Sequence, residues 1–245
     1  MRSALSIMEL VVVIIMLGIL TTVVMYNKEF KSAAQVRAAM KQFIDYQADI
    51  NNFRSRFESL PGDFERAYDF WPDKCASETQ CNGDGNGLID SYKESHLAWL
   101  HLADAGYISG NYTGQGYQDN NTSREGVNAP SGAISETQLS LTNPTYDFLA
   151  NRNFLIMGSF KSGDLGYGGG ISPIQAARID EKIDNGLPTG RLSGRNGFVN
   201  GSFDSGECLI SDANIILANT DDLSQSFYNE NLGNLKHCIL AYRLD

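Results

Sequence analysis

An almost unbroken apolar run from Leu10 to Met25, with the carboxylate of Glu9 directly before it, constrains this chain more than any other feature. A helix from Leu5 to Met25 would be roughly 31 Å long at about 1.5 Å per residue, which matches a bilayer core of about 30 Å. An unpaired charge in hydrocarbon costs at least a few kcal/mol, so Glu9 needs a specific partner. The sequence therefore predicts that residues 5–26 span a membrane and that Glu9 has a function of its own.

Two ordinary interpretations of such a run fit less well. A cleaved signal peptide has a shorter apolar core followed by a small-x-small site, and residues 21–26, Thr-Thr-Val-Val-Met-Tyr, contain none. A plain single-pass anchor has no use for a glutamate near its start and usually carries more than one basic residue on its cytoplasmic side. Arg2 is the only basic residue before the run, so more than simple anchoring is indicated.

The helix is predicted to continue well beyond the apolar run. No proline or glycine occurs between Gly18 and Pro61, and apolar residues recur at helical spacing in the second half. These residues are Val36, Met40, Phe43, Ile44, Ile50, Phe53 and Phe57. We predict one helix from Leu5 to Glu58, ended by Pro61 and Gly62, whose second half is amphipathic and packs on a domain.

The rest of the chain has patterns of both helix and strand. Helical patterns cover residues 92–105 and a segment that begins at Ser172 and Pro173, whereas the polar residues 109–145 are typical of a surface loop. Strand patterns occur at residues 153–160, 208–210, 214–217 and 237–244. The expected fold class is α+β, with a long N-terminal helix, half transmembrane and half amphipathic, packed on a small antiparallel sheet with short helices and long loop insertions.

Charge and composition argue against two classes of function. The chain has 19 basic and 29 acidic residues, a formal net charge of -10, and no cluster of Lys and Arg, so no nucleic-acid partner is expected. None of the three histidines stands beside a recognisable nucleophile motif such as Gly-x-Ser-x-Gly, which argues against an enzyme.

The four cysteines form a close pair, Cys75 and Cys81, and a late pair, Cys208 and Cys238. They lack the spacing of a zinc site and favour disulfides in an oxidising compartment. Of the three connectivities that four cysteines allow, we predict Cys75 with Cys81 and Cys208 with Cys238, because each pair lies within one local segment. Four reduced thiols in a cytosolic protein are the alternative.

The loop after the first cysteine pair has oxygen-bearing residues at the spacing of an EF-hand-like calcium loop. The candidate calcium ligands are Asn82, Asp84, Asn86, Leu88 and Asp90. Lys93 occupies the twelfth position, where a bidentate acid belongs, and Glu94 follows one residue late. Weak calcium binding is one interpretation, and a Gly/Asn turn tightened by a disulfide is the other. Upstream of this loop, Asp63 is predicted as the N-cap of a short helix.

Residues 4–14, Ala-Leu-Ser-Ile-Met-Glu-Leu-Val-Val-Val-Ile, resemble the processing and assembly segment of type IV pilin-like proteins, which include the pseudopilins of type II secretion. The resemblance implies that residues 1–4 are a leader removed by a prepilin peptidase between Ala4 and Leu5, and that Leu5 becomes the methylated N-terminus. Ala4 stands where the family nearly always has glycine, and Leu5 where it usually has phenylalanine. Glu9 matches the glutamate at the fifth mature position of the family.

Further segments are similar to one bacterial subgroup of these proteins. They are Leu-Pro-Gly-Asp at residues 60–63 and the segments 82–87, 99–108 and 179–188. The likeness therefore touches most of the chain, but only the N-terminal motif has a known role.

The resemblance implies that residues 5–26 lie in a bacterial inner membrane and that residues 27–245 form a periplasmic pilin-like domain. The amine of Leu5 in one subunit would neutralise Glu9 of its neighbour, so that the buried charge becomes favourable only on assembly. The expected function is a structural subunit, of the minor kind, in a periplasmic or cell-surface filament with other pilin or pseudopilin subunits. A membrane-anchored periplasmic ligand-binding or adhesive protein is the alternative.

Overall fold

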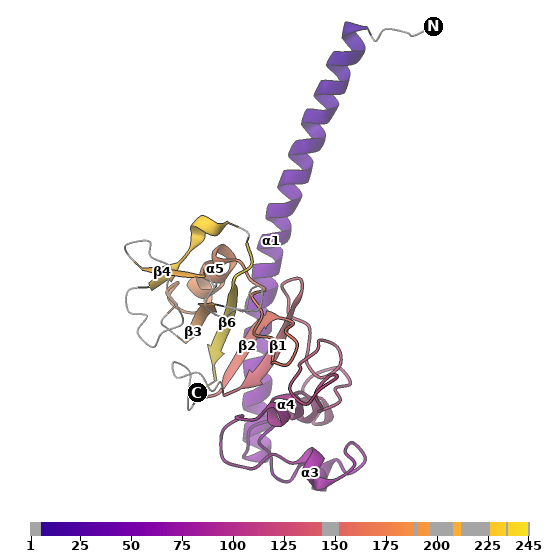
Figure 1. The fold of residues 1–245 in the computed structure, drawn as a ribbon, viewed down its shortest axis with the longest axis vertical. Coiled ribbons are helices and arrows are strands. Elements are labelled where there is room, and N and C mark those ends of the chain that lie inside the picture. The colour runs from indigo at the N-terminus through magenta and orange to yellow at the C-terminus, as the bar shows by residue number, and fades with distance from the viewer. Residues whose placement is uncertain are drawn as a thin grey trace.

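A computed structural model describes residues 6–143, 152–188, 191–196, 208–211, 226–233 and 235–244 of the chain. The fold is α+β, as predicted, with one long N-terminal helix and a small antiparallel sheet. Helix α1 (Ile7–Phe57) runs through the globular part and projects far beyond it toward the N-terminus (Figure 1). The globular part therefore surrounds only the C-terminal half of this helix.

The bounds of α1 agree closely with the predicted helix. It begins after Ser6, whose hydroxyl accepts a hydrogen bond from the Glu9 amide, and ends at Glu58 in the left-handed conformation with φ of 56°. The Glu58 amide donates to the carbonyl of Arg54, so the helix closes three residues before Pro61. The two halves of the helix differ sharply in burial, because the large apolar side chains from Ile7 to Leu20 are exposed and the second half is packed on the domain.

The second half of α1 lies against the domain through one helical face. Val36, Ala39, Phe43, Ile50 and Phe53 are buried on this face, which confirms the predicted amphipathic pattern. Ile44, predicted as part of this face, is instead 55% exposed, because it follows Phe43 around the helix and points away from the domain.

The first half of α1 is apolar and open. Its large apolar side chains from Ile7 to Leu20 are each at least 45% exposed. Among the described residues, no helix meets the length and hydropathy needed to cross a membrane.

The main sheet has four strands in the order β1-β2-β6-β3, and every neighbouring pair is antiparallel. Its strands are β1 (Thr137–Thr142), β2 (Phe154–Ser159), β3 (Leu192–Asn196) and β6 (Cys238–Arg243). A separate two-stranded sheet pairs β4 (Leu209–Ser211) with β5 (Ser226–Tyr228). The predicted strands at 153–160, 208–210 and 237–244 correspond to β2, β4 and β6, whereas the predicted strand at 214–217 lies outside the described residues.

Both faces of the main sheet are covered. One face packs on α1, where the ring of Phe43 lies 5.9 Å from that of Tyr242 and the Tyr242 hydroxyl donates to Gln47 at 2.7 Å. The other face, which includes Ile156 and Ala241, packs under the 163–170 connection through Leu165. The central strands are therefore buried on both sides.

The prediction that residues 109–145 form one loop is wrong at residues 137–142, which form β1.

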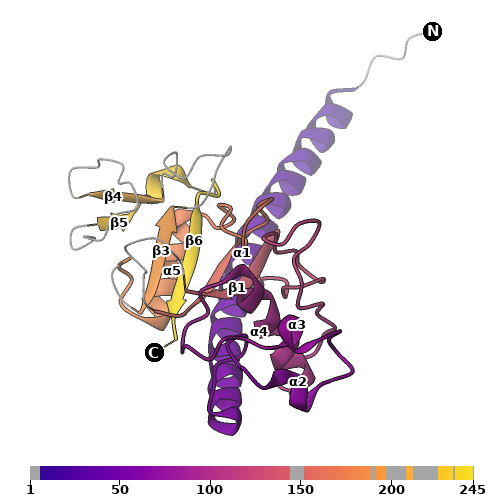
Figure 2. The same cartoon turned by 60° about the horizontal axis from the view of Figure 1, so that its bottom comes forward.

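The short helices cover the rest of the core (Figure 2). They are α2 (Ala67–Phe70), α3 (Glu78–Cys81), α4 (Tyr92–Asp104), α5 (Pro173–Ile183) and the 3-10 helix η2 (Glu230–Leu232). Helix α5 is capped by Ser172 with Pro173 in its first turn, as predicted, and helix α4 is capped by Ser91. Trp99 of α4 packs edge-on against Tyr46 of α1, with ring centroids 5.4 Å apart.

Two disulfides close the predicted pairs of cysteines. Cys75 and Cys81 have Cα atoms 5.5 Å apart, and Cys208 and Cys238 have Cα atoms 5.1 Å apart. Cys208 directly precedes β4 and Cys238 opens β6, so the second bridge joins the small sheet to the main sheet. Disulfides of this kind fit an oxidising compartment.

Candidate functional site

The first candidate site is the N-terminal end of α1. Ser6 and Glu9 form a capping box, in which the Glu9 carboxylate accepts from the Ser6 amide at 2.8 Å and the Ser6 hydroxyl accepts from the Glu9 amide at 3.3 Å. Both residues are exposed, and so are the apolar side chains of Ile7 and Met8 between them. The predicted processing residues Ala4 and Leu5 lie outside the described residues.

The cap leaves Glu9 able to bind a further group. A carboxylate has about four acceptor positions on two oxygens, and the Ser6 amide is bonded to only one oxygen, Oε2. A cation near the helix N-terminus could therefore pair with Glu9 without breaking the cap. The site combines one acid with an apolar helix surface that is exposed along residues 7–20, and exposed apolar surfaces of this size are typical of interaction sites.

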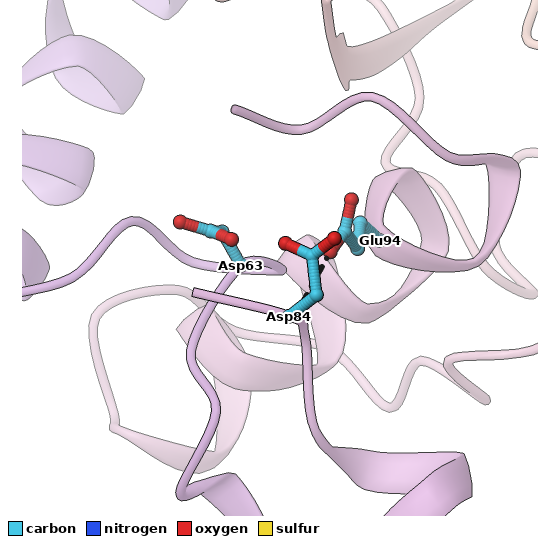
Figure 3. A group of neighbouring side chains, drawn as sticks. All are labelled: Asp63, Asp84 and Glu94. Carbon is cyan, nitrogen blue, oxygen red and sulfur yellow. Dashed lines mark hydrogen bonds between the residues drawn. The ribbon is translucent and has the colours of Figure 1, made fainter. Parts of the chain in front are cut away.

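The second candidate site is the polar loop that was predicted to bind calcium. Three carboxylates converge there, and their oxygens lie within 4.8 Å of one another: those of Asp63, Asp84 and Glu94 (Figure 3). Asp63 and Glu94 are each only 2% exposed, whereas Asp84 is exposed. Carboxylate oxygens at such distances are the ligands that calcium prefers, so these three residues could hold a divalent cation.

Backbone amides hold the two buried carboxylates in place. Asp63 accepts from the amides of Asn86 at 3.0 Å and Gly87 at 2.9 Å, and Glu94 accepts from the amides of Asp84 at 3.1 Å and Asp90 at 3.2 Å. Burial raises the pKa of both carboxyl groups, and these amides oppose the rise by stabilising the charged forms. The loop is thus folded around two acids that lie outside the set of predicted ligands.

The predicted ligand set is only partly brought together. The Asn86 amide group donates to the carboxylates of Asp84 and Asp90, at 3.1 Å each, so these three residues are neighbours. Asn82 instead accepts from the backbone amide of Tyr68 at 2.8 Å. The amide of Leu88 donates to the Asn86 side chain, which closes a tight turn within the loop.

The prediction that Asp63 caps a short helix is wrong. Helix α2 begins only at Ala67, after Arg66, and Asp63 faces the 86–87 amides instead. The reason is the close approach of Gly62, which has φ of 93°: a Cβ there would lie 2.3 Å from the carbonyl oxygen of Glu94. This contact places the next residue, Asp63, over the loop.

We call the three converging carboxylates of Asp63, Asp84 and Glu94 the carboxylate platform. A buried histidine connects this platform to the first disulfide. His101 accepts at Nδ1 from the Gly62 amide at 2.9 Å, and its Nε2 lies 2.8 Å from the Cys81 carbonyl oxygen, to which it donates. Burial lowers the pKa of His101 to about 4, so the ring is neutral near pH 7. The histidine is therefore a structural link between the Gly62 turn and the backbone of Cys81.

Sequence reasoning missed Asp63 as a partner of the loop and placed Glu94 just outside it. Asp63 is far from Asp84 along the chain, so no local spacing rule joins the two residues. A usable signal was the Leu-Pro-Gly-Asp segment, whose proline and glycine mark a turn directly before the acid.

Comparison of the chain with protein-family models, with curated proteins and with solved structures found no match.

Proposed function

We propose that this protein is a structural subunit, of the minor kind, in a type IV pilus-like or type II secretion pseudopilus filament. The observation that carries the proposal is the contrast between the two halves of α1: the side chains from Ile7 to Leu20 are apolar and exposed, whereas the second half is packed on the domain. A helix that is apolar on all sides is stable only inside lipid or inside a bundle of other helices. In this proposal the inner membrane provides the lipid, and the filament core provides the bundle of helices.

In this proposal Glu9 sets the position of each subunit relative to the next. Prepilin peptidase removes residues 1–4, and the new amine of Leu5 pairs with Glu9 of a neighbouring subunit. Two opposite charges that leave water together, with hydrogen bonds to each, cost far less than one unpaired carboxylate. The acceptor positions that the Ser6 cap leaves on Glu9 support this role.

The rest of the chain would form the periplasmic head. The two disulfides support a location in an oxidising compartment, where an inner-membrane subunit places its C-terminal domain. The head would then form the filament surface, and the apolar half of α1 its core. No catalytic role is assigned in this proposal.

The decisive test is the substitution Glu9→Gln in cells that carry a pilin-type assembly machinery. The variant is expected to reach the membrane at the normal level but to enter sheared filaments at a level reduced about tenfold or more, since the amine of its neighbour loses a charged partner. Glu58→Gln is the matched control, because Glu58 is an exposed glutamate at the other end of the same helix. Normal incorporation of Glu9→Gln would reject the pairing.

Intact mass and N-terminal sequencing of membrane-derived protein test the processing step separately. Loss of residues 1–4 together with a methylated Leu5 supports a filament subunit. An intact Met1 on protein that stays in the membrane would favour the alternative, a membrane-anchored periplasmic ligand-binding or adhesive protein.

A further inference from the structure

A cavity of about 440 Å3 lies between α3, the first turns of α4 and the loop at residues 114–121. It is far from the N-terminal end of α1 and does not involve the carboxylate platform. Four amide side chains, one aromatic ring and one imidazole are prominent in its lining: those of Gln80, Gln115, Asn120, Asn121, Tyr92 and His96. The cavity is of the size at which proteins bind small molecules.

His96 is the unusual member of this lining. The residue is only 1% exposed, and neither ring nitrogen has a hydrogen-bond partner among the described residues. A buried polar group without a partner is costly, and most buried polar atoms in proteins are satisfied. Because His96 belongs to the lining of the cavity, a polar group of a bound ligand is the partner that its imidazole lacks.

The walls of the cavity are held by hydrogen bonds to their neighbours. The Lys93 ammonium donates to the Thr79 carbonyl at 3.2 Å, which ties α4 to α3, and the Tyr92 hydroxyl donates to Asp164 at 3.4 Å. On the opposite side, Asp119 accepts from the backbone amides of Asn121 and Thr122 at 2.8 and 2.7 Å. These bonds hold the walls of the cavity in place, so that binding requires only a local side-chain change at His96, which limits its entropy cost.

The charges around the cavity favour a neutral ligand. Burial lowers the pKa of His96 to about 4, an effect that Asp119 opposes, so the imidazole is neutral near pH 7. The one cation of the lining, Lys93, already bonds to a carbonyl, and no carboxylate of the described residues lines the cavity. A cation would find no charged partner in this lining, and an anion would find only the exposed Lys93 ammonium, whose pairing in water contributes little.

The hydrogen-bonding groups favour a ligand rich in hydroxyls. Each amide side chain offers donors and an acceptor, and the neutral imidazole offers one of each. Hydroxyl groups donate and accept at once, so neighbouring hydroxyls on one ring match such a lining better than an apolar molecule does. The aromatic ring of Tyr92, which is 38% exposed, adds apolar contact for the C–H groups of a sugar.

We infer that this cavity binds a neutral saccharide unit, with a sugar hydroxyl bonded to the His96 ring and others bonded to the amides around the mouth. Each ring nitrogen is covered from solvent, so the sugar reaches it when the ring or a covering side chain changes rotamer, as is common on binding. The inference is independent of filament assembly and would give the head of the protein a recognition function of its own.

The test uses the full chain in a detergent without a sugar headgroup, labelled with 15N in its three histidines. Glucose, galactose and N-acetylglucosamine, and the trimers maltotriose and chitotriose, are titrated to about 50 mM while the ring nitrogen signals are recorded. At least one saccharide is expected to shift the His96 signals and leave those of His101 and His237 unchanged. Tighter binding of a trimer than of its monomer would identify a polysaccharide as the source, and equal binding a free sugar.

Variants separate binding from folding. Asn120→Ala combined with Asn121→Ala is expected to weaken binding about tenfold, since both residues are exposed and line the cavity. Asn111→Ala, at an exposed asparagine that precedes this loop and lies outside the cavity lining, is the matched control and should bind normally. His96→Phe should fold, because it fills the same space without unpaired nitrogens, and should lose the sugar.

Three results would overturn the inference. The first is that none of the five saccharides shifts the His96 signals. The second is that the double asparagine variant and His96→Phe both bind as tightly as the unchanged protein. The third is that phosphate or acetate shifts these signals and the sugars do not, which would assign the cavity to an anion.

Discussion

The carboxylate of Glu9 and the backbone of Ser6 are joined by a hydrogen bond of 2.8 Å, and the amide of Glu9 donates back to the Ser6 hydroxyl. One glutamate thus completes the helix cap of its own chain and, in the proposed filament, holds the terminus of a neighbour. These two roles use the same side chain, so a loss of function in a Glu9 variant alone does not tell them apart.

Ser6→Ala separates the cap from the pairing. The variant loses the side-chain half of the capping box, which costs about 1 kcal/mol at the helix end, but keeps the carboxylate. Filament incorporation is expected to fall less than about threefold, against about tenfold or more for Glu9→Gln, when both are measured in sheared filaments normalised to membrane levels. Equal defects in the two variants would show that Glu9 acts through the cap.

The Cys208–Cys238 bridge is expected to contribute more to stability than the Cys75–Cys81 bridge. It spans 30 residues against 6, and a longer closed loop restricts the unfolded chain more. Replacing Cys208 and Cys238 by serine should cost about 3 to 4 kcal/mol, and replacing Cys75 and Cys81 clearly less, in urea unfolding. A larger loss for the short loop would show that the Cys75–Cys81 bridge stabilises the folded platform directly.

The carboxylate platform is expected to respond to calcium. With Asp63, Asp84 and Glu94 converging, bound calcium would offset their mutual repulsion, so excess calcium should raise the melting temperature relative to chelator. Asp63→Asn should remove the increase, while Asp69→Asn, an exposed acid paired with Arg66, should retain it. If the melting temperature is the same in calcium and in chelator, the loop binds no calcium and is a turn stabilised by its backbone amides.

The sequence was most informative where a property is local. The extent of helix α1, the Ser172 cap and the pairing of nearby cysteines each depend on residues close in the chain, and they are present as predicted or nearly so. The Cys208–Cys238 pair was also found because its two members share one late segment.

Contacts between distant segments were harder to predict. Strand β1 lies in a stretch whose polar composition is typical of a loop. Thr137, Gln138 and Ser140 are nevertheless buried there, because their side-chain donors bond to backbone carbonyls and because β1 pairs with β2. Asp63 reaches the 86–87 amides only through the fold of the Gly62 turn. Spacing rules carry no information about such encounters, since they depend on which segments pack together.

Asp180 makes the stability of the C-terminal half dependent on pH. The residue is fully buried in α5, and its carboxylate accepts from the Tyr228 hydroxyl of β5 at 2.5 Å and from the Gly186 amide at 3.2 Å. Burial raises its pKa to about 6, and the Tyr228 hydrogen bond opposes the rise. The folded protein therefore holds the proton more tightly than the unfolded chain, whose aspartates titrate near pH 3.9.

The sign of the pH dependence follows from this difference. Below about pH 4 both states are protonated and the stabilisation from proton binding is complete; it is lost as pH rises through about 6, where the folded state also releases its proton. Asp180→Asn keeps an acceptor for Tyr228 but cannot ionise, so its melting temperature relative to the unchanged protein should rise from pH 4 to pH 7. The difference should be on the order of 2 kcal/mol in free energy of unfolding. Glu181→Gln, a substitution of the exposed neighbouring residue, is the control and should show no such trend. A constant difference in melting temperature between Asp180→Asn and the unchanged protein from pH 4 to pH 7 would contradict the raised pKa of Asp180.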